Sequence, residues 1–149
     1  MSEFAAWRRL DRPGSDAALL RPQTGGWLLQ GAAAFDNELG PATVAYQVEV
    51  DARWETRRGI VSGFLGDKTV RREILRDDRG WRLDGVPVQG LKHLVDLDSD
   101  SLIELPQIYE RRGDATYWYE APTVPYQALL EIAPNGFVRS YPGLWRLVA

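Results

Sequence analysis

The feature of the sequence that most constrains the fold is a regular alternation of apolar and polar residues across residues 41–65. Val44 and Tyr46 are followed at every second position by further valines, with alanine, glutamine or glutamate between them. A period of two in β-branched and aromatic residues is typical of a strand with one buried face. The same period resumes at Trp54, after residues 51–53. The segment therefore predicts a β-hairpin with one apolar face.

The length of the hairpin loop determines which residues lie opposite each other. A three-residue loop, Asp51-Ala52-Arg53, places Val50 opposite Trp54 and keeps the apolar residues on one face, which is what usually fixes strand pairing. A two-residue loop would instead place Arg57 beside Val48. We expect the three-residue loop.

An arginine lies next to the apolar face in either register. With the three-residue loop, Arg58 lies opposite Tyr46 and points the same way as Trp54. An unpaired charge is costly in such a position. Arg58 is therefore expected to pair with an acid such as Glu49 or Glu55, or with an anionic ligand such as a phosphate or a fatty-acid headgroup.

Most of the remaining chain also consists of short alternating segments separated by turn sequences that contain glycine, proline, asparagine or aspartate. Besides the two halves of 41–65, the predicted strands are residues 4–10, 17–21, 27–35, 68–76, 80–85, 102–109, 115–120, 124–132, 136–141 and 144–148. Ten or more strands joined by tight turns predict one all-β domain over residues 1–149, an antiparallel meander with little or no helix that closes into a barrel, roll or sandwich. Residues 68–76 and 124–132 are apolar on parts of both faces, which predicts a sheet that is layered or rolled up so that both faces are covered.

Composition excludes several classes of protein. The net charge is −3, so the chain gains little from releasing counterions on nucleic acid, and no nucleic-acid partner is expected. The absence of cysteine excludes disulfides, thiolate metal sites and a cysteine nucleophile. No apolar run approaches the roughly 20 residues of a membrane-spanning helix, and the N-terminus lacks the pattern of a signal peptide. A cytoplasmic protein is the expectation.

Motifs of catalysis and metal binding are missing. His93 is the single histidine, and Ser62 lies in GIVSGF, where the glycine spacing is wrong for a nucleophile elbow. The acidic segment around Asp96, Asp98 and Glu104 lacks the glycine and glutamate of a calcium loop. We therefore expect no catalytic residues, no metal and no cofactor. A hydrolase of glycans or lipids that uses these acids is the third alternative.

Aromatic residues carry more information, because the chain has six tryptophans and six tyrosines. Tyr117, Trp118 and Tyr119 are consecutive, so in a strand they present rings to both faces of the sheet. Such rings fill buried layers, or they stack on a sugar while their polar edges bind its hydroxyls. An exposed aromatic strand is also consistent with a protein–protein or self-association surface.

Three segments, YQVEVDARWETRR, GWRLDG and VRSYPGLWRL, together resemble the putative glycolipid-binding family, an uncharacterised bacterial family whose fold is described as a spiral β-roll and is likened to lipoprotein carriers of the cell envelope. The resemblance extends from about Val44 to the C-terminus. The matching motif positions are Asp51, Trp54, Thr56, Arg57, Trp81, Gly85, Tyr141, Pro142 and Gly143. This chain departs from the family between Asp98 and Leu105, where relatives have a longer acidic segment followed by a T-P-F-T-N type run.

The resemblance implies a spiral β-roll that binds a small amphipathic ligand, a glycolipid or lipid-like molecule, without catalysis. In this hypothesis Trp54 and Trp118 supply apolar or stacking surface, and Arg57 or Arg58 holds a charged headgroup. The candidate ligand-binding residues are Tyr46, Trp54, Thr56, Arg57, Arg58, Trp118 and Tyr141. The alternative is an interaction module of unknown role that uses residues 117–119. The sequence does not predict the oligomeric state.

Overall fold

The computed structural model of the chain describes residues 1–89, 94–96, 101–103 and 105–149, with only the backbone described at 94–96, 101 and 102. These residues form fifteen strands and no helix. The strands are β1 (Glu3–Arg9), β2 (Gly14–Gln23), β3 (Gly26–Asn37), β4 (Gly40–Asp51), β5 (Thr56–Leu65), β6 (Lys68–Asp77), β7 (Gly80–Leu83), β8 (Val86–Val88), β9 (Leu94–Asp96), β10 (Ser101–Ile103), β11 (Ile108–Arg111), β12 (Thr116–Ala121), β13 (Tyr126–Ile132), β14 (Val138–Tyr141) and β15 (Trp145–Leu147). The predicted all-β fold is confirmed.

Thirteen strands form one antiparallel sheet, in the order β11-β12-β13-β14-β15-β1-β2-β3-β4-β5-β6-β7-β8, and β9 pairs with β10 in a separate hairpin. Neighbours in the sheet are also neighbours in the chain, except where the last strand, β15, pairs with the first, β1. The sheet is therefore a meander in which the pairing of β15 with β1 joins the C-terminal strands to the N-terminal strands. Its two edge strands, β8 and β11, are not paired with each other. It does not close into a barrel.

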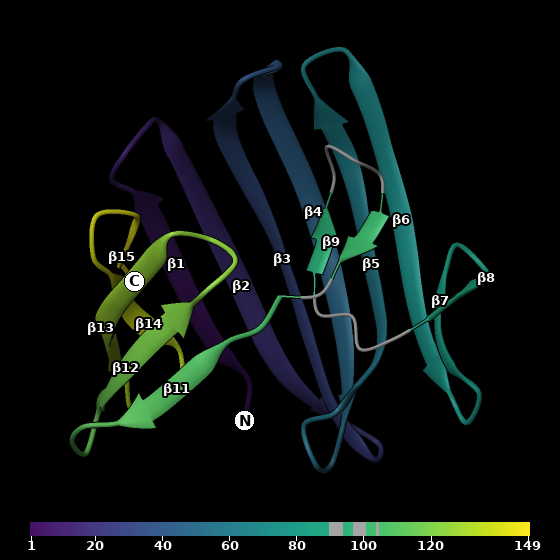
Figure 1. The fold of residues 1–149 in the computed structure, drawn as a ribbon. Coiled ribbons are helices and arrows are strands. Elements are labelled where there is room, and N and C mark those ends of the chain that lie inside the picture. Colours follow the sequence, from purple (N-terminus) through teal and green to yellow (C-terminus); the bar gives the residue numbers. More distant parts are fainter. Residues whose placement is uncertain (90–93, 97–100, 104) are drawn as a thin grey trace.

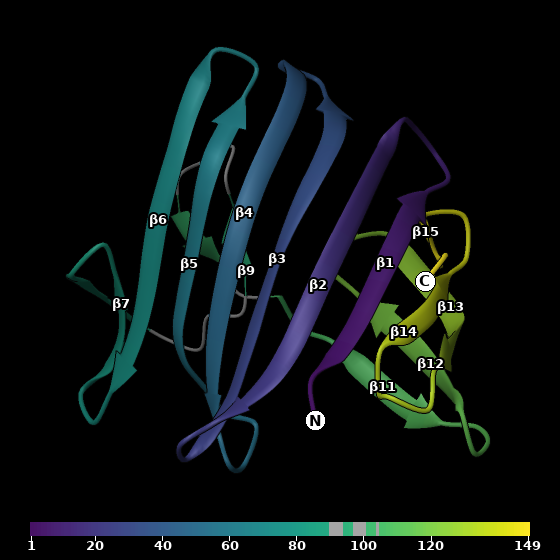
Figure 2. The same cartoon turned by 180° about the vertical axis from the view of Figure 1, so that it is seen from behind.

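The sheet curves strongly, so that the strands near the C-terminus lie over one side of the long N-terminal strands (Figure 1 and Figure 2). In Figure 1, β11, β12 and the β9–β10 hairpin lie in front of the long strands β1 to β6, and in Figure 2 the long strands lie in front. We call the enclosed side the inner face and the opposite side the outer face. Among the described residues there is no helix long and apolar enough to cross a membrane.

The β4–β5 hairpin has a longer loop than the alternation predicts. Tyr46 lies opposite Val61 and Glu49 lies opposite Arg58, with a bulge between Glu49 and Val50. The predicted three-residue loop is therefore wrong, because the loop covers residues 52–55. The shift in register is odd, so Arg58 lies on the outer face with Glu49 and not on the inner face with Tyr46.

Small residues on the inner face allow a large ring to lie flat across the sheet. Ala18, Gly31, Tyr46 and Val61 lie in one cross-strand row. A Cβ atom at Gly31 would collide with the Tyr46 ring and with the carbonyl oxygen of Ala17. Glycine at this position therefore lets Tyr46 on β4 lie across β3 toward β2.

Two buried clusters on the inner face hold the sheet in its curved shape. One joins β3 to β6, and the other joins β12 to β13. The first contains Ala33, Ala42, Val44, Leu65 and Val70, and the second contains Tyr119, Ala121, Ala128 and Leu130. Leu65, Val70 and Leu130 have at most 1% of their surface exposed.

The outer face carries apolar residues that nothing covers among the described residues. Leu75 on β6 is 40% exposed and Leu129 on β13 is 47% exposed. They belong to residues 68–76 and 124–132, the two segments that predicted a sheet covered on both faces. That prediction is wrong for these strands, because only their inner face is buried.

Candidate functional site

The inner face encloses a cavity of about 630 Å³ beside the β4–β5 loop. Six of the apolar side chains that line it come from β2, β3, β4 and the β4–β5 loop: Leu20, Trp27, Leu29, Val48, Val50 and Trp54. Glu3 and the turn residues 135–137 complete its walls, together with Met1. We call this cavity the apolar chamber. Its lining follows from the period of two, because cross-strand neighbours on β2, β3 and β4 present their side chains to the same face.

A second cavity of about 350 Å³ lies next to it and shares Leu29, Gly136 and Phe137 with the apolar chamber. Five aromatic side chains line it: Trp7, Tyr46, Phe137, Tyr141 and Trp145. Among the residues that the structure describes, Asp16 is the one charged residue in its lining. We call this cavity the aromatic chamber, and the two chambers together the inner groove.

The turn between β13 and β14 forms one wall of the inner groove. Gly136 has a φ of 86°, and its N–H donates to the Ala133 carbonyl (2.8 Å), as expected for the sequence Pro-Asn-Gly. The ring of Phe137 packs edge-on against Trp7, with ring centres 5.5 Å apart. The indole N–H of Trp7 donates to the Val138 carbonyl (2.7 Å), which fixes the turn over β1.

Trp54 lies at the margin of the apolar chamber. Its indole stacks on Trp27, with ring centres 5.5 Å apart and planes 15° from parallel, and 57% of its surface is exposed. Its φ is 64°, a left-handed conformation that costs a residue with a Cβ atom ~1–2 kcal/mol. Strain of this kind is concentrated at functional sites. Trp54 is the most exposed tryptophan among the large hydrophobic residues described.

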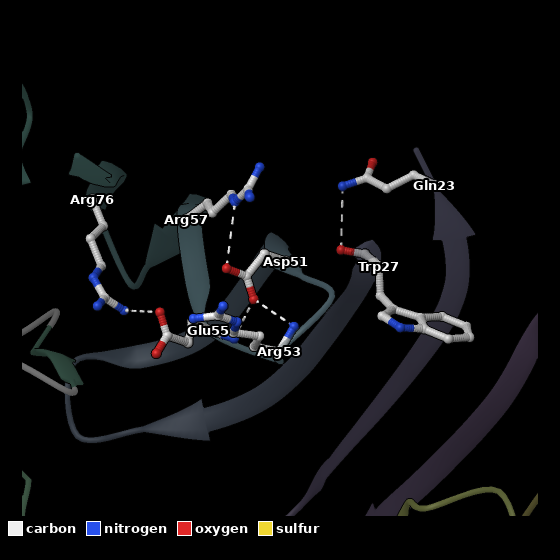
Figure 3. Close-up of polar contacts among 7 residues, drawn as sticks. All are labelled: Gln23, Trp27, Asp51, Arg53, Glu55, Arg57 and Arg76. Atoms are coloured by element: carbon white, nitrogen blue, oxygen red, sulfur yellow. Dashed lines mark hydrogen bonds and ion pairs between the residues drawn. The ribbon is translucent and has the colours of Figure 1, made fainter. Parts of the chain in front are cut away.

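The carboxylate of Asp51 holds the loop that carries Trp54. Its Oδ1 accepts hydrogen bonds from the backbone N–H groups of Arg53 (2.8 Å) and Glu55 (3.0 Å). Arg57 approaches the other oxygen at 3.8 Å, as Figure 3 shows. The backbone hydrogen bonds, that of Glu55 first, lower the pKa of Asp51. Asp51 thus acts as the anchor of the loop.

Asp16 and Tyr46 form the polar floor of the aromatic chamber. The Tyr46 hydroxyl lies 3.0 and 3.2 Å from the two carboxylate oxygens of Asp16, and it donates across β3 above Gly31. Burial raises the pKa of Asp16 above its usual value. Burial first, and then the Asp16 charge, raises the pKa of Tyr46. Tyr46 is therefore a neutral hydrogen-bond donor at physiological pH.

Tyr141 joins the aromatic chamber to a group of tyrosines. Tyr119 lies at its centre, with ring centres 4.9 Å from Tyr109, 6.0 Å from Tyr126 and 6.2 Å from Tyr141. Burial raises the pKa of Tyr141. Gln107 donates to the Tyr119 hydroxyl (2.9 Å). Tyr141 thus connects the aromatic chamber to a packed group of tyrosine rings.

The structure brings three of the predicted site residues together: Tyr46, Trp54 and Tyr141 line the inner groove. Thr56 and Arg57 line a different cavity of about 580 Å³, which is polar and lies between the β4–β5 loop and the β6–β7 turn. Arg76 also lines that cavity, where it approaches Glu55 at 3.3 Å (Figure 3).

Arg58 and Trp118 lie apart from the inner groove. The Arg58 guanidinium lies 2.7 Å from Glu73 and 3.6 Å from Glu49 on the outer face, so the expected ion pair within the chain is present. Trp118 lies opposite Glu110 and Leu129, on the face away from Tyr119. Consecutive rings on β12 thus occupy both faces, as predicted. Tyr119 is buried and Trp118 is half-buried.

Several residues that line the inner groove were not predicted as site residues, among them Trp7, Asp16, Trp27, Phe137 and Trp145. Asp16 is the polar member of an inward alternation with Ala18 and Leu20, and an acid at such a position is a usable signal. The acids of the hydrolase alternative at 98 and 104, and the histidine at 93, lie outside the described residues. Within the described part of the chain, no three His, Cys, Asp or Glu residues are grouped to hold a metal.

The fold and the groove define an all-β protein with an apolar internal groove that has one polar end. A comparison with protein families matches residues 4–102 to the family described as "Putative glycolipid-binding". This match covers more than half of the chain, so the chain belongs to that family. The match begins earlier than the resemblance inferred from the sequence, and it ends before the YPGLW segment. Comparisons with curated proteins and with solved structures each found no match.

Proposed function

We propose that this protein binds a small amphipathic molecule, a glycolipid or similar lipid, in the inner groove and does not transform it. The observation that carries the proposal is the apolar chamber of about 630 Å³ with the exposed indole of Trp54 at its margin. Binding sites for small molecules are typically cavities of ~300–1,000 Å³ lined by apolar and aromatic residues with a few polar groups. The family description supports the same class of ligand.

The two chambers suit the two parts of an amphipathic ligand. An alkyl chain in the apolar chamber would contact Leu29 and Val48, and each methylene removed from water contributes ~0.8 kcal/mol. The indoles of Trp27 and Trp54 would cover the chain where it enters. The polar headgroup would then lie in the aromatic chamber beside Asp16 and Tyr46.

The placement of the arginines alters the original hypothesis for the headgroup. Arg58 is bound to Glu73 on the outer face, and Arg57 lies in the polar cavity beside Asp51. Neither lines the inner groove. The proposed headgroup site therefore moves from these arginines to the aromatic chamber.

Quenching of tryptophan fluorescence by brominated lipids tests the proposal. The probes are monoacyl lipids and glycolipids with bromine atoms on the acyl chain, because bromine quenches only the indoles that it approaches. We expect saturable quenching that decreases in Trp54→Phe and Trp27→Phe. Trp118→Phe is the matched control, because Trp118 lies away from the groove.

Two results would count against the proposal. One is the absence of quenching by every lipid of the panel in a protein that melts cooperatively. The other is an equal loss of quenching in Trp54→Phe and Trp118→Phe, which would place the lipid on the surface and not in the groove. Filling the apolar chamber by Val48→Trp should abolish quenching by the same probes.

A further inference from the structure

We infer that the aromatic chamber recognises the headgroup through the carboxylate of Asp16, and that it selects an uncharged headgroup rich in hydroxyls, such as a sugar, over an anionic one. This inference rests on the proposed function, because it assigns the polar end of the same ligand. It concerns the charge of the headgroup and the residue that recognises it, which neither the family description nor the apolar chamber determines.

The charges that line the inner groove are negative. Glu3 lines the apolar chamber and Asp16 lines the aromatic chamber, and among the residues that the structure describes no lysine or arginine lines either one. The Arg9 guanidinium lies 5.5 Å from the ring centre of Trp145 but is bound to Asp11 at 2.7 Å. A phosphate, sulfate or carboxylate headgroup would therefore meet a like charge, and the described lining offers no lysine or arginine to neutralise it.

The hydrogen-bonding groups of the chamber suit hydroxyl donors. The Tyr46 hydroxyl supplies one donor to the two oxygens of Asp16, and a carboxylate accepts several hydrogen bonds. Burial leaves the carboxylate poorly solvated and raises its pKa. Hydroxyl groups of a ligand would replace the missing solvation, and hydrogen bonds to a carboxylate are about twice as strong as those between neutral groups.

The rings of the chamber suit a flat ligand with an apolar face. Trp7, Trp145 and Tyr141 line a space of about 350 Å³ around Asp16. A sugar ring presents C–H groups to such rings while its hydroxyls point to the polar atoms at the edge. A quaternary ammonium group would also be attracted by the rings and the carboxylate, but it has no hydroxyl to donate. The two chemistries are therefore separable by experiment.

The test compares three ligands with the same chain: octyl glucoside, octyl sulfate and octyltrimethylammonium, each below its micelle-forming concentration. Binding is measured by calorimetry on the full chain. We expect octyl glucoside to bind at least about tenfold more tightly than octyl sulfate, which corresponds to the gain or loss of one hydrogen bond to a charged group. In Asp16→Asn this ratio should fall by about tenfold. Asp67→Asn, which removes the same charge from an exposed turn, is the control and should leave the ratio unchanged.

The results separate this inference from the proposed function. Equal binding of all three ligands would show that the groove recognises only the octyl chain of the ligand. That result would overturn the inference and leave the proposed function standing. Tighter binding of octyltrimethylammonium than of octyl glucoside would also overturn the inference, because the positive charge of the headgroup, and not its hydroxyl donors, would then determine the affinity. Binding of none of the three, in a protein that melts cooperatively, would overturn both. An unchanged ratio in Asp16→Asn would remove Asp16 from the recognition site.

Discussion

Trp54 provides a test of the β4–β5 loop, because its side chain and its backbone act on stability in opposite directions. The stack on Trp27 contributes ~0.5–1.5 kcal/mol, and the left-handed φ of 64° costs ~1–2 kcal/mol. Trp54→Gly removes both effects, while glycine also gives the unfolded chain more freedom, which costs ~0.4–1 kcal/mol. The free energy of unfolding of Trp54→Gly should therefore lie within about 1 kcal/mol of the wild-type value.

Trp54→Ala loses the same stack but keeps the backbone strain. We expect Trp54→Ala to be less stable than Trp54→Gly by ~0.5–1 kcal/mol. This difference is the backbone strain that alanine keeps, minus the cost of the greater freedom that glycine gives the unfolded chain. The measurement is urea unfolding followed by far-ultraviolet circular dichroism, so that the lost indole does not affect the signal. The midpoint of thermal unfolding should be lower by about 1–4 °C in the alanine variant. An alanine variant as stable as the glycine variant, or more so, would refute the left-handed conformation at this residue.

Three further predictions concern other parts of the site. Gly31→Ala should lower the free energy of unfolding by ~1–3 kcal/mol, because its methyl group collides with the Tyr46 ring; an unchanged thermal midpoint would contradict the flat placement of that ring. The pKa of Asp51 is lowered in the folded state, so its stabilising effect should be complete above about pH 4 and disappear as the pH falls through its folded-state pKa. The difference in urea midpoint between wild type and Asp51→Ala should accordingly shrink from pH 7 to pH 3, and a constant difference would speak against the anchor. Arg58→Gln should leave the dissociation constant of the brominated lipids unchanged, since Arg58 is bound to Glu73 on the outer face; weaker binding would return Arg58 to the site.

The all-β fold was predictable because a period of two is a local signal that repeats in almost every segment. Turn residues such as those at 134–136 mark the ends of strands without reference to the rest of the chain. The strand limits were less predictable: β2 begins at Gly14, inside the expected turn, because Gly14 pairs with Phe35 on β3. Pairing with a long neighbour extends a strand beyond its local preference.

The register of the β4–β5 hairpin was not predictable from alternation alone. Trp54 continues the apolar pattern of β5, so the pattern favours placing it in the strand. The longer loop depends on the Asp51 side chain, which accepts hydrogen bonds from two backbone N–H groups within the loop. A side chain that replaces ladder hydrogen bonds in this way leaves no trace in hydrophobic periodicity.

The polar floor of the aromatic chamber was hidden for a different reason. Asp16 and Tyr46 lie on β2 and β4, which are not adjacent, and they meet only because Gly31 on β3 leaves room between them. To predict this contact, the registers of β2 with β3 and of β3 with β4 must both be known. Tyr46 itself was predicted, since its inward position follows from the alternation with Val44 and Val48.

The pairing of β15 with β1 has a consequence for the integrity of the whole molecule. Trp7 lies opposite Leu147, and the Ala6 N–H donates to the Ala149 carbonyl at 2.7 Å. Proline at residue 148 would remove the N–H that donates to the Ala6 carbonyl (2.8 Å), and it would weaken the pairing that joins the N-terminal and C-terminal parts of the sheet. If this pairing opened, the backbone edges of β1 and β15 would be free to pair with strands of other chains. Aggregation would then be observed before a loss of ligand binding.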